Sequence, residues 1–182
     1  MSDNTLRIRL QVHYGQAYLV DGEADSAPAP LGGPSGMLCP GPPGSGSATL
    51  LTGPHTADVD LTVGVYASDP GPALEDYEDA VEASLHLPHG RPVLAEWAHE
   101  RVHTLPELPA GPGWYRLRYH ACDADAGARA EQESDDDEDR DPVDAYLLQI
   151  WPAPESAPRV LAAYSQTMQY WISARERGNG AP

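Results

Sequence analysis

The sequence predicts a mainly β protein, an antiparallel β-sandwich or jelly-roll-like domain with one C-terminal α-helix. Short segments in which apolar and polar residues alternate recur along the chain, and this period of two is typical of strands with one buried face. Gly, Pro and Asp separate these segments at short intervals, as in sheets whose successive strands are joined by turns. Because the chain has 182 residues, we expect a single domain over residues 1–182 with one hydrophobic core.

The first strand is expected at residues 6–14, where the alternation is strict. The apolar side chains that share its inward face are Leu6, Ile8, Leu10, Val12 and Tyr14. After a short turn at Gly15 and Gln16, residues 17–20 are expected to return as a hairpin partner of this strand.

Residues 21–53 are expected to form a long irregular surface loop. They include eight Gly, six Pro and four Ser, a composition that favours turns and does not support a β-ladder. A glycine-rich phosphate-binding loop is the alternative, but it requires a Gly-Lys-Ser/Thr sequence between a strand and a helix. This segment lacks that sequence, so we favour the irregular loop.

Three further strands are expected where the alternation resumes, at residues 58–66, 81–87 and 92–97. A connector with three prolines at residues 105–113 leads into the pair of strands around which we expect the domain to be built, residues 114–122 and 145–151. The inward faces of this central pair are Tyr115, Leu117, Tyr119 and Ala121 on the first strand and Tyr146, Leu148 and Ile150 on the second.

The pattern changes near the C-terminus, where a helix is expected at residues 158–177. Arg175 and Arg177 fall in its last turn, where cations interact favourably with the helix dipole, and Gly178 follows as a stop signal. The apolar positions that recur at helical spacing are Val160, Leu161, Tyr164, Met168, Trp171 and Ile172.

The charge of the chain is strongly negative and unevenly distributed. The net charge of −17 argues against binding to nucleic acid or to an anionic membrane, and it permits a basic protein partner. Residues 123–144 form an acidic insert with 11 acidic residues and two arginines. The residues that we predict to bind a basic partner are Asp135, Asp136, Asp137, Glu138, Asp139 and Asp141. A solvated, self-repelling loop is the default interpretation of such a run of acidic residues, and a docking surface is the functional one. A cation site is a further alternative, although the insert lacks the glycine turn of EF-hand loops.

One short motif raises an alternative function. The sequence His99-Glu100-Arg101-Val102-His103 matches the His-Glu-x-x-His pattern, in which a helix directs two imidazoles at zinc and the Glu acts as a base. Pro106 follows closely, and the sequence frames no clear third ligand. A metal-dependent hydrolase or metal-binding module that uses His99, Glu100 and His103 is therefore the alternative, and we expect no metal and no cofactor.

Two strands carry basic residues on their outward faces. These residues are Arg7, Arg9 and His13 on the first strand and Arg116, Arg118 and His120 on the central one. If the two strands were neighbours, they would form one basic face that binds an anion. Pairing of these side chains with carboxylates, such as Glu82 or those of the acidic insert, is the interpretation that we favour.

Cys39 and Cys122 are the only cysteines, and we expect two reduced thiols rather than a disulfide. The N-terminus lacks the basic and apolar regions of a signal peptide, and no apolar stretch approaches the ~20 residues that span a bilayer. These features predict a cytoplasmic protein.

Two segments carry a resemblance to known families, Leu108-Pro-Ala-Gly-Pro-Gly-Trp-Tyr-Arg-Leu117 and Asp144-Ala-Tyr-Leu-Leu-Gln-Ile-Trp151. Over most of its length the chain resembles a group of uncharacterised actinobacterial β-sandwich proteins. Through the Leu-Pro-x-Gly-x-Tyr-x-Leu pattern it is distantly similar to the competence-associated nuclease inhibitors, small acidic β-proteins that bind and silence a DNA-entry nuclease. The chain departs from these inhibitors in its acidic insert and its final helix, and no functional residue carries over.

From charge and resemblance together we expect a non-enzymatic, acidic interaction protein. Its role would be that of an inhibitor or immunity-type protein that binds a basic partner such as a nuclease. A carboxylate-rich surface suits this role, because it can occupy a phosphate-binding groove and its charge speeds encounter.

Overall fold

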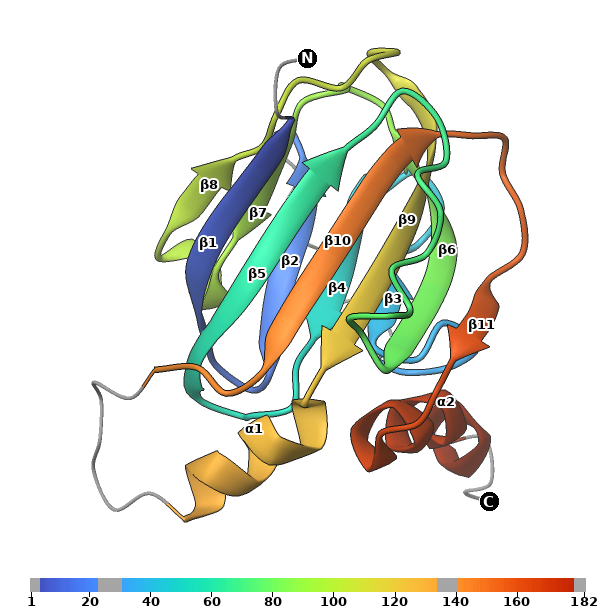
Figure 1. The fold of residues 1–182 in the computed structure, drawn as a ribbon. Helices are drawn as coiled ribbons and strands as arrows, with labels where there is room; N and C mark the ends of the chain where they lie inside the picture. Colours follow the sequence, from blue (N-terminus) through green and yellow to red (C-terminus); the bar gives the residue numbers. More distant parts are fainter. Residues whose placement is uncertain (1–3, 23–30, 134–140, 179–182) are drawn as a thin grey trace.

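Two β-sheets face each other in a computed structural model of the protein, and two helices lie together at one end of them (Figure 1). The structure describes residues 4–22, 31–133 and 141–178, with side chains in the last helix as far as Ala174. The larger sheet has six strands in the order β1 (Thr5–Val12), β5 (Ala57–Val65), β10 (Ala145–Pro152), β9 (Gly113–Cys122), β6 (Asp79–Leu87) and β11 (Arg159–Ala162). The smaller sheet has five, in the order β3 (Leu38–Pro40), β4 (Ser47–Leu51), β2 (Gln16–Asp21), β7 (Pro92–Ala95) and β8 (Val102–Thr104).

This arrangement confirms the predicted mainly β sandwich with a C-terminal helix. A 3-10 turn, η1 (Trp97–His99), joins β7 to β8, and the helices are α1 (Ala124–Gln132) and α2 (Gln166–Gly178). The sheets are antiparallel in every described ladder except one, because β10 runs parallel to β5. Among the described residues, no helix combines the length and the apolar character needed to cross a bilayer.

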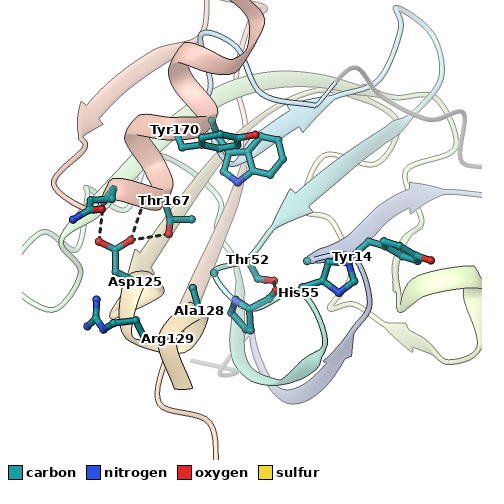
Figure 2. A pocket seen from close by; sticks show the side chains of 13 residues that line it. Tyr14, Thr52, His55, Asp125, Ala128, Arg129, Thr167 and Tyr170 are labelled. Atoms are coloured by element: carbon teal, nitrogen blue, oxygen red, sulfur yellow. Dashed lines mark hydrogen bonds between the residues drawn. The ribbon is translucent and has the colours of Figure 1, made fainter. Parts of the chain in front are cut away.

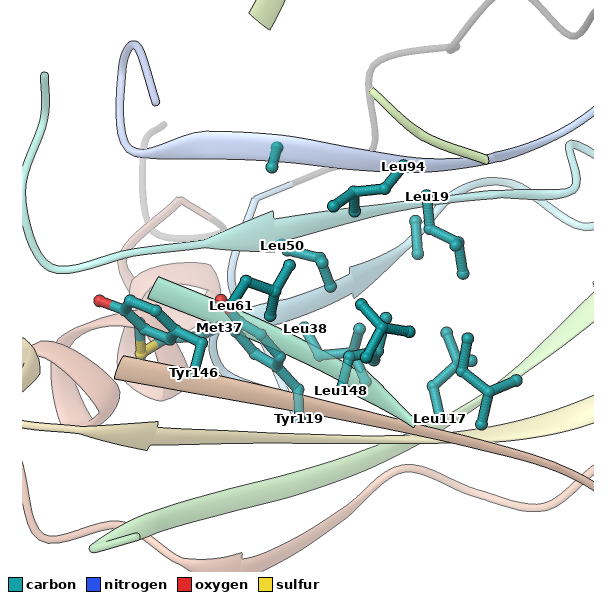
Figure 3. Packing of buried hydrophobic residues seen from close by; sticks show 14 of the residues in the cluster. Leu19, Met37, Leu38, Leu50, Leu61, Leu94, Leu117, Tyr119, Tyr146 and Leu148 are labelled. Atoms are coloured by element: carbon teal, nitrogen blue, oxygen red, sulfur yellow. The ribbon is translucent and has the colours of Figure 1, made fainter. Parts of the chain in front are cut away.

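The predicted central pair is confirmed and lies in the middle of the larger sheet. β9 and β10 are antiparallel neighbours, with Leu148 opposite Tyr119 and Ile150 opposite Leu117. Their inward side chains meet leucines of the smaller sheet, such as Leu19, in the core between the two layers (Figure 3). Because β5 and β6 flank the pair, both strands are almost wholly buried, and this burial makes the pair the centre of the domain.

The hairpin predicted between residues 6–14 and 17–20 is wrong. The two strands share only one isolated bridge, His13 with Gln16, and then separate into different sheets. β1 pairs with β5, whereas β2 pairs with β4 and β7. The apolar faces of β1 and β2 therefore approach the same core from opposite sides, which buries more apolar surface than a two-stranded hairpin does.

Residues 21–53 are not a wholly irregular loop, since they contain β3 and β4. All five residues of β4 are buried, because β3 and β2 flank it within the smaller sheet. The glycines serve close packing as well as turns. A Cβ at Gly36 would lie 2.5 Å from the Met168 sulfur of α2, and one at Gly32 would lie 2.5 Å from the Trp171 carbonyl oxygen. Residues 23–30 lie outside the described residues.

The C-terminal helix is shorter than predicted. α2 begins at Gln166, and β11 occupies part of the segment where residues 158–165 were expected to be helical. The start of α2 is fixed by Asp79, whose Oδ1 accepts hydrogen bonds from the backbone N–H of Tyr164 at 2.7 Å and of Ser165 at 3.1 Å. The Ser165 hydroxyl also donates to Asp79, and it accepts a bond from Met168 N–H at 2.9 Å, as an N-cap residue does.

The outward basic residues do not form one face. β1 and β9 are separated by β5 and β10, and the side chains of Arg116, Arg118 and His120 are buried. Residues 66–78 run across this outer face on their way from β5 to β6 (Figure 1).

The favoured pairing of these arginines with Glu82 is confirmed. The Nε atoms of Arg116 and Arg118 donate to the two Glu82 oxygens at 3.1 and 2.7 Å. Arg118 also lies 2.9 Å from Asp69, and His120 Nε2 accepts a hydrogen bond from Ala73 N–H at 3.1 Å. These last two contacts hold residues 66–78 against the sheet.

Candidate interaction surface

Acidic side chains gather at the end of the sandwich that carries α1. The exposed members, which we call the acidic end, are Asp60, Asp76, Glu78, Asp123, Glu133 and Asp141. They come from β5, from the segment before β6, from both ends of α1 and from the segment before β10, and the chain reversals bring all of these to one end of the larger sheet (Figure 1). The predicted acidic insert thus begins and ends here.

Burial and, after it, neighbouring negative charges raise the pKa of several groups at this end. Burial, and then the charges of Asp79 and Asp123, raise the pKa of Glu78. Burial followed by the charges of Asp123 and Glu78 raises the pKa of the Cys122 thiol in the same way. Burial raises the pKa of Asp144 to about 6, against the hydrogen bond from Tyr146. Exposed Asp123 and Glu78 therefore form a surface that a cation would stabilise.

Of the residues predicted to bind a partner, the structure places Asp141. Its Oδ1 lies 3.0 Å from Arg9 Nη2, and Arg9 Nε also lies 3.7 Å from Asp60. Among the described residues, Arg9 is the cation that forms ion pairs with the acidic end. Asp135, Asp136, Asp137, Glu138 and Asp139 lie outside the described residues. Asp141, near the C-terminal end of the insert, therefore forms an ion pair with Arg9 of β1.

A pocket opens beside the acidic end, between α1, α2 and two loops of the sandwich (Figure 2). Its volume is about 590 Å³. The residues that line it are Tyr14, Gly15, Thr52, Gly53, Pro54, His55, Asp125, Ala128, Arg129, Gln166, Thr167, Tyr170 and Trp171. Aromatic rings and small residues dominate this lining, and Asp125 and Arg129 are its charged members.

Carboxylates of α1 fix the walls of the pocket. Asp125 accepts hydrogen bonds from Gln166 N–H and Thr167 N–H, each at 2.9 Å, and from the Thr167 hydroxyl at 2.7 Å. At the other end of α1, Glu131 accepts bonds from His55 N–H at 2.5 Å and Thr56 N–H at 2.7 Å. One short helix therefore ties α2 to the loop between β4 and β5.

A buried chain of hydrogen bonds fixes the loop between β4 and β5. Gly53 N–H donates to the Tyr146 hydroxyl at 2.7 Å, and this hydroxyl donates to Asp144 at 2.6 Å. A Cβ at Gly53 would lie 1.9 Å from the Ala124 carbonyl oxygen, so only glycine fits between the loop and α1. The rim of the pocket is rigid for these reasons.

Tyr14 stands at the pocket edge, not on the inward face of a strand as predicted. β1 ends at Val12, and Tyr14 and Gly15 form a two-residue turn with φ of 56° and 62°. The Tyr14 side chain is 57% exposed. Its ring packs edge-on against His55 at 4.8 Å and at a tilt against Trp97 at 5.5 Å between centroids. The turn presents an aromatic ring to solvent.

The His-Glu-x-x-His segment does not form the helix that a zinc site of this kind requires. His99 ends η1 with a left-handed φ of 58°, and His103 lies on β8. His103 Nε2 is 3.0 Å from Glu96 Oε1 and so makes a local pair. Within residues 4–22, 31–133 and 141–178, no group of three or more His, Cys, Asp or Glu side chains is arranged to hold a metal ion. The structure therefore does not support the alternative site at His99, Glu100 and His103, because the three residues do not lie on one helix.

Both cysteines are free thiols in the structure. Cys39 is buried on β3, where burial raises its pKa to about 11 against a hydrogen bond from Gly32 N–H. Cys122 is partly exposed at the end of β9.

Comparison with known proteins shows what this fold is similar to. No protein-family model and no curated protein sequence matches the chain. The solved structure of ComJ from Bacillus subtilis, an inhibitor of the DNA degrading activity of NucA, matches with a TM-score of 0.50 at 12% identity, over 81% of this chain and 96% of ComJ. The product of crocagin biosynthetic gene J matches with a TM-score of 0.49 at 14% identity, over 85% of this chain and all of that one.

The likeness to ComJ concerns the fold. The similarity to nuclease inhibitors expected from the sequence is confirmed by the ComJ structure. The resemblance to actinobacterial proteins stays a prediction. The fold is similar to that of a known nuclease inhibitor. The acidic end and the aromatic pocket are the two surface features that suggest a function.

Proposed function

We propose that this protein is a non-enzymatic inhibitor that binds a basic protein, such as a nuclease, through its acidic end. The observation that supports this proposal is the concentration of exposed carboxylates at one end of the sandwich. Among the described residues, Arg9 is the cation that pairs with them. The fold supports the proposal, because ComJ inhibits the DNA degrading activity of NucA.

The physical mechanism is competition for a phosphate-binding surface. A nuclease attracts the DNA backbone with Lys and Arg side chains, and a rigid carboxylate surface interacts with the same cations. The net charge of −17 accelerates encounter with a basic partner, and this effect weakens as salt screens the charges. We therefore expect an association rate that falls steeply with ionic strength.

Capture followed by an activity assay tests the proposal. The immobilised protein is incubated with an extract of its native host, captured proteins are purified, and their degradation of DNA is measured with and without the free protein. NucA is assayed in parallel. The expected result is a basic nuclease whose activity is lost at stoichiometric inhibitor. If no captured protein and no assayed nuclease loses activity, the proposal is wrong.

A matched pair of variants tests whether the acidic end is the binding surface. The triple variant Asp76→Asn, Glu78→Gln, Asp123→Asn removes three exposed charges from the acidic end. The control triple, Glu100→Gln, Glu107→Gln, Glu155→Gln, removes three exposed charges elsewhere and has the same net charge. We expect the first to slow association at least tenfold more than the second. Equal effects would show that only total charge matters.

The acidic insert needs a separate test, because its central residues lie outside the described part of the chain. Replacing residues 134–140 with a Gly-Ser linker of the same length removes five carboxylates and one arginine. We expect weaker binding of the captured nuclease. Unchanged binding would remove the role predicted for Asp135, Asp136, Asp137, Glu138 and Asp139.

A further inference from the structure

We propose that the free edge of β1 binds an extended segment of another protein, with carboxylates at alternate positions, which adds to the larger sheet as a further strand. This proposal goes beyond the proposed function, because it assigns a second surface whose charge preference is opposite to that of the acidic end. The hydrogen-bonding register of β1, its length and the charges on its outward face support the assignment.

Alternate residues of β1 direct their backbone groups away from the sheet. β1 is the last strand of the larger sheet, so no described strand pairs with its other side (Figure 1). In the register of β1 with β5, Asn4 lies opposite Val65 and accepts a hydrogen bond from its N–H at 3.0 Å. Hydrogen-bonded pairs recur at every second residue of an antiparallel ladder, so the residues between them direct N–H and C=O groups to the free edge. These residues are Thr5, Arg7, Arg9 and Gln11.

β1 differs in length and regularity from the other strands that end the two described sheets. β3 and β8, at the edges of the smaller sheet, have three residues each, and β11 has four with a register shift in its pairing. Short or irregular edges offer few groups to another strand. The eight residues of β1 contain no proline and pair with β5 without a bulge, so their free edge is a template for strand addition.

The outward side chains of β1 select the charge of the added segment. Arg7 and Arg9 are exposed and two residues apart, so they lie on one face of the sheet. Arg9 pairs with Asp60 and Asp141, whereas Arg7 forms no ion pair with a described residue. A strand at the free edge places its side chains about 5 Å from those of β1, where opposite charges stabilise the ladder. Carboxylates two residues apart therefore match Arg7 and Arg9.

The segment is expected to carry apolar residues between its carboxylates. Side chains at those positions point to the interior of the sandwich, as Leu6 and Ile8 do on β1. Leu6 is only partly buried and packs against the core, so an apolar neighbour would cover more of it.

A second copy of this chain does not suit the edge. When two copies of β1 pair antiparallel through all four free residues, Arg7 of one copy lies opposite Arg9 of the other, and like charges in that position destabilise a ladder. Each copy also has a net charge of −17, which opposes association. The edge is therefore suited to a different protein.

Synthetic peptides test the edge in the full-length protein. The probe is acetyl-Thr-Val-Glu-Val-Glu-Val-Thr-amide at millimolar concentration. One control peptide has Lys at both Glu positions. The other is N-methylated at both Glu residues, so it keeps the charges but loses the N–H groups that would face β1.

Amide hydrogen exchange, measured by NMR, is the readout. We expect the Glu peptide to slow exchange at Arg7 and Arg9 about tenfold or more, and to leave Ile8 and Leu10 unchanged because their N–H groups face β5. Equal protection by the Lys peptide or by the N-methylated peptide would overturn the proposal. So would the absence of protection at Arg7 and Arg9.

Variants of the protein separate backbone pairing from charge. Gln11→Pro removes one outward N–H without changing the charge, and proline is tolerated where the N–H of an edge strand faces solvent. Arg7→Gln removes an outward charge and leaves the backbone intact. Arg91→Gln is its matched control, since Arg91 is exposed and lies between β6 and β7.

The affinity for the Glu peptide is expected to fall about fivefold or more in Gln11→Pro and in Arg7→Gln, and to be unchanged in Arg91→Gln. Equal losses in Arg7→Gln and Arg91→Gln would show that only net charge matters, and would contradict the proposal. Unchanged affinity in Arg7→Gln would contradict it as well, whether or not Gln11→Pro folds.

Discussion

Asp125 Oδ1 on α1 lies 2.9 Å from the backbone nitrogen of Thr167, in the first turn of α2. The same oxygen accepts the Thr167 hydroxyl, and Oδ2 accepts Gln166 N–H. Burial raises the pKa of Asp125, but these hydrogen bonds outweigh burial and leave the pKa below its ordinary value. A carboxylate on one helix thus satisfies the N-terminus of another helix about 40 residues later, as an N-cap side chain does.

Replacing Asp125 with Ala is expected to destabilise the protein by about 1–2 kcal/mol, the usual cost of removing a capping side chain. Urea denaturation measures the change. Asp123→Asn is the control, because Asp123 is exposed, makes no side-chain capping bond to α1 and has a left-handed φ of 57° that Asn also adopts. The control should change stability by less than ~0.5 kcal/mol. Equal losses would show that Asp125 does not act as a cap for α2.

Replacing Glu82 with Gln is expected to destabilise the protein by ~3–5 kcal/mol, because it leaves the buried guanidinium groups of Arg116 and Arg118 without their shared carboxylate. Thermal and urea unfolding measure the loss. Glu155→Gln, an exposed site, is the control and should be nearly neutral. A small effect of Glu82→Gln would show that the remaining acceptors, such as Asp69 for Arg118, are sufficient for the buried guanidinium groups.

His120 is expected to make the protein sensitive to acid. Burial, and the charge of Arg118, lower its pKa to about 4 from an ordinary 6.5, against the hydrogen bond to the Leu147 carbonyl and the charge of Glu82. Between pH 6.5 and 4 the unfolded state binds a proton there that the folded state does not, so stability falls as pH falls through this window. The loss attributable to His120 is ~3 kcal/mol at pH 4.

The measurement is the free energy of unfolding between pH 7 and 4 for the protein and for His120→Gln. Asp144 acts in the opposite direction, because its pKa of about 6 lets the folded state hold a proton that the unfolded state releases. Both proteins retain Asp144, so the difference between their curves isolates His120. That difference should grow as pH falls. Parallel curves would show that His120 does not titrate in the folded protein as described.

Tyr14→Asn is expected to leave the free energy of unfolding unchanged or to raise it by up to ~1 kcal/mol, because Asn adopts the left-handed conformation at lower cost. Urea denaturation with Tyr18→Asn as a comparison checks this. Tyr18 is half-buried on β2 and donates to Gln16, so its loss should destabilise the protein. Destabilisation by Tyr14→Asn would show that the Tyr14 ring contributes more to packing than its exposure indicates.

The strands of the larger sheet other than β11 were predictable from alternation, because a half-buried strand places apolar and polar side chains at alternate positions. The pairing of Arg118 with Glu82 was predictable for a similar reason, since opposite charges on adjacent strands stabilise each other and the two residues lie opposite in the register of β6 and β9. β4 was not predicted, because it is buried on both faces and its sequence therefore shows no alternation of apolar and polar residues.

The acidic character and the mainly β composition of this protein follow from local sequence, since charge and side-chain period are properties of residues close along the chain. The pocket has no such local signal. Tyr14, His55 and Trp171 line one pocket only because β1 and β2 separate into opposite sheets and α1 links α2 to the β4–β5 loop. Those choices depend on the total apolar surface buried between the two sheets, a long-range quantity that no short stretch of sequence contains.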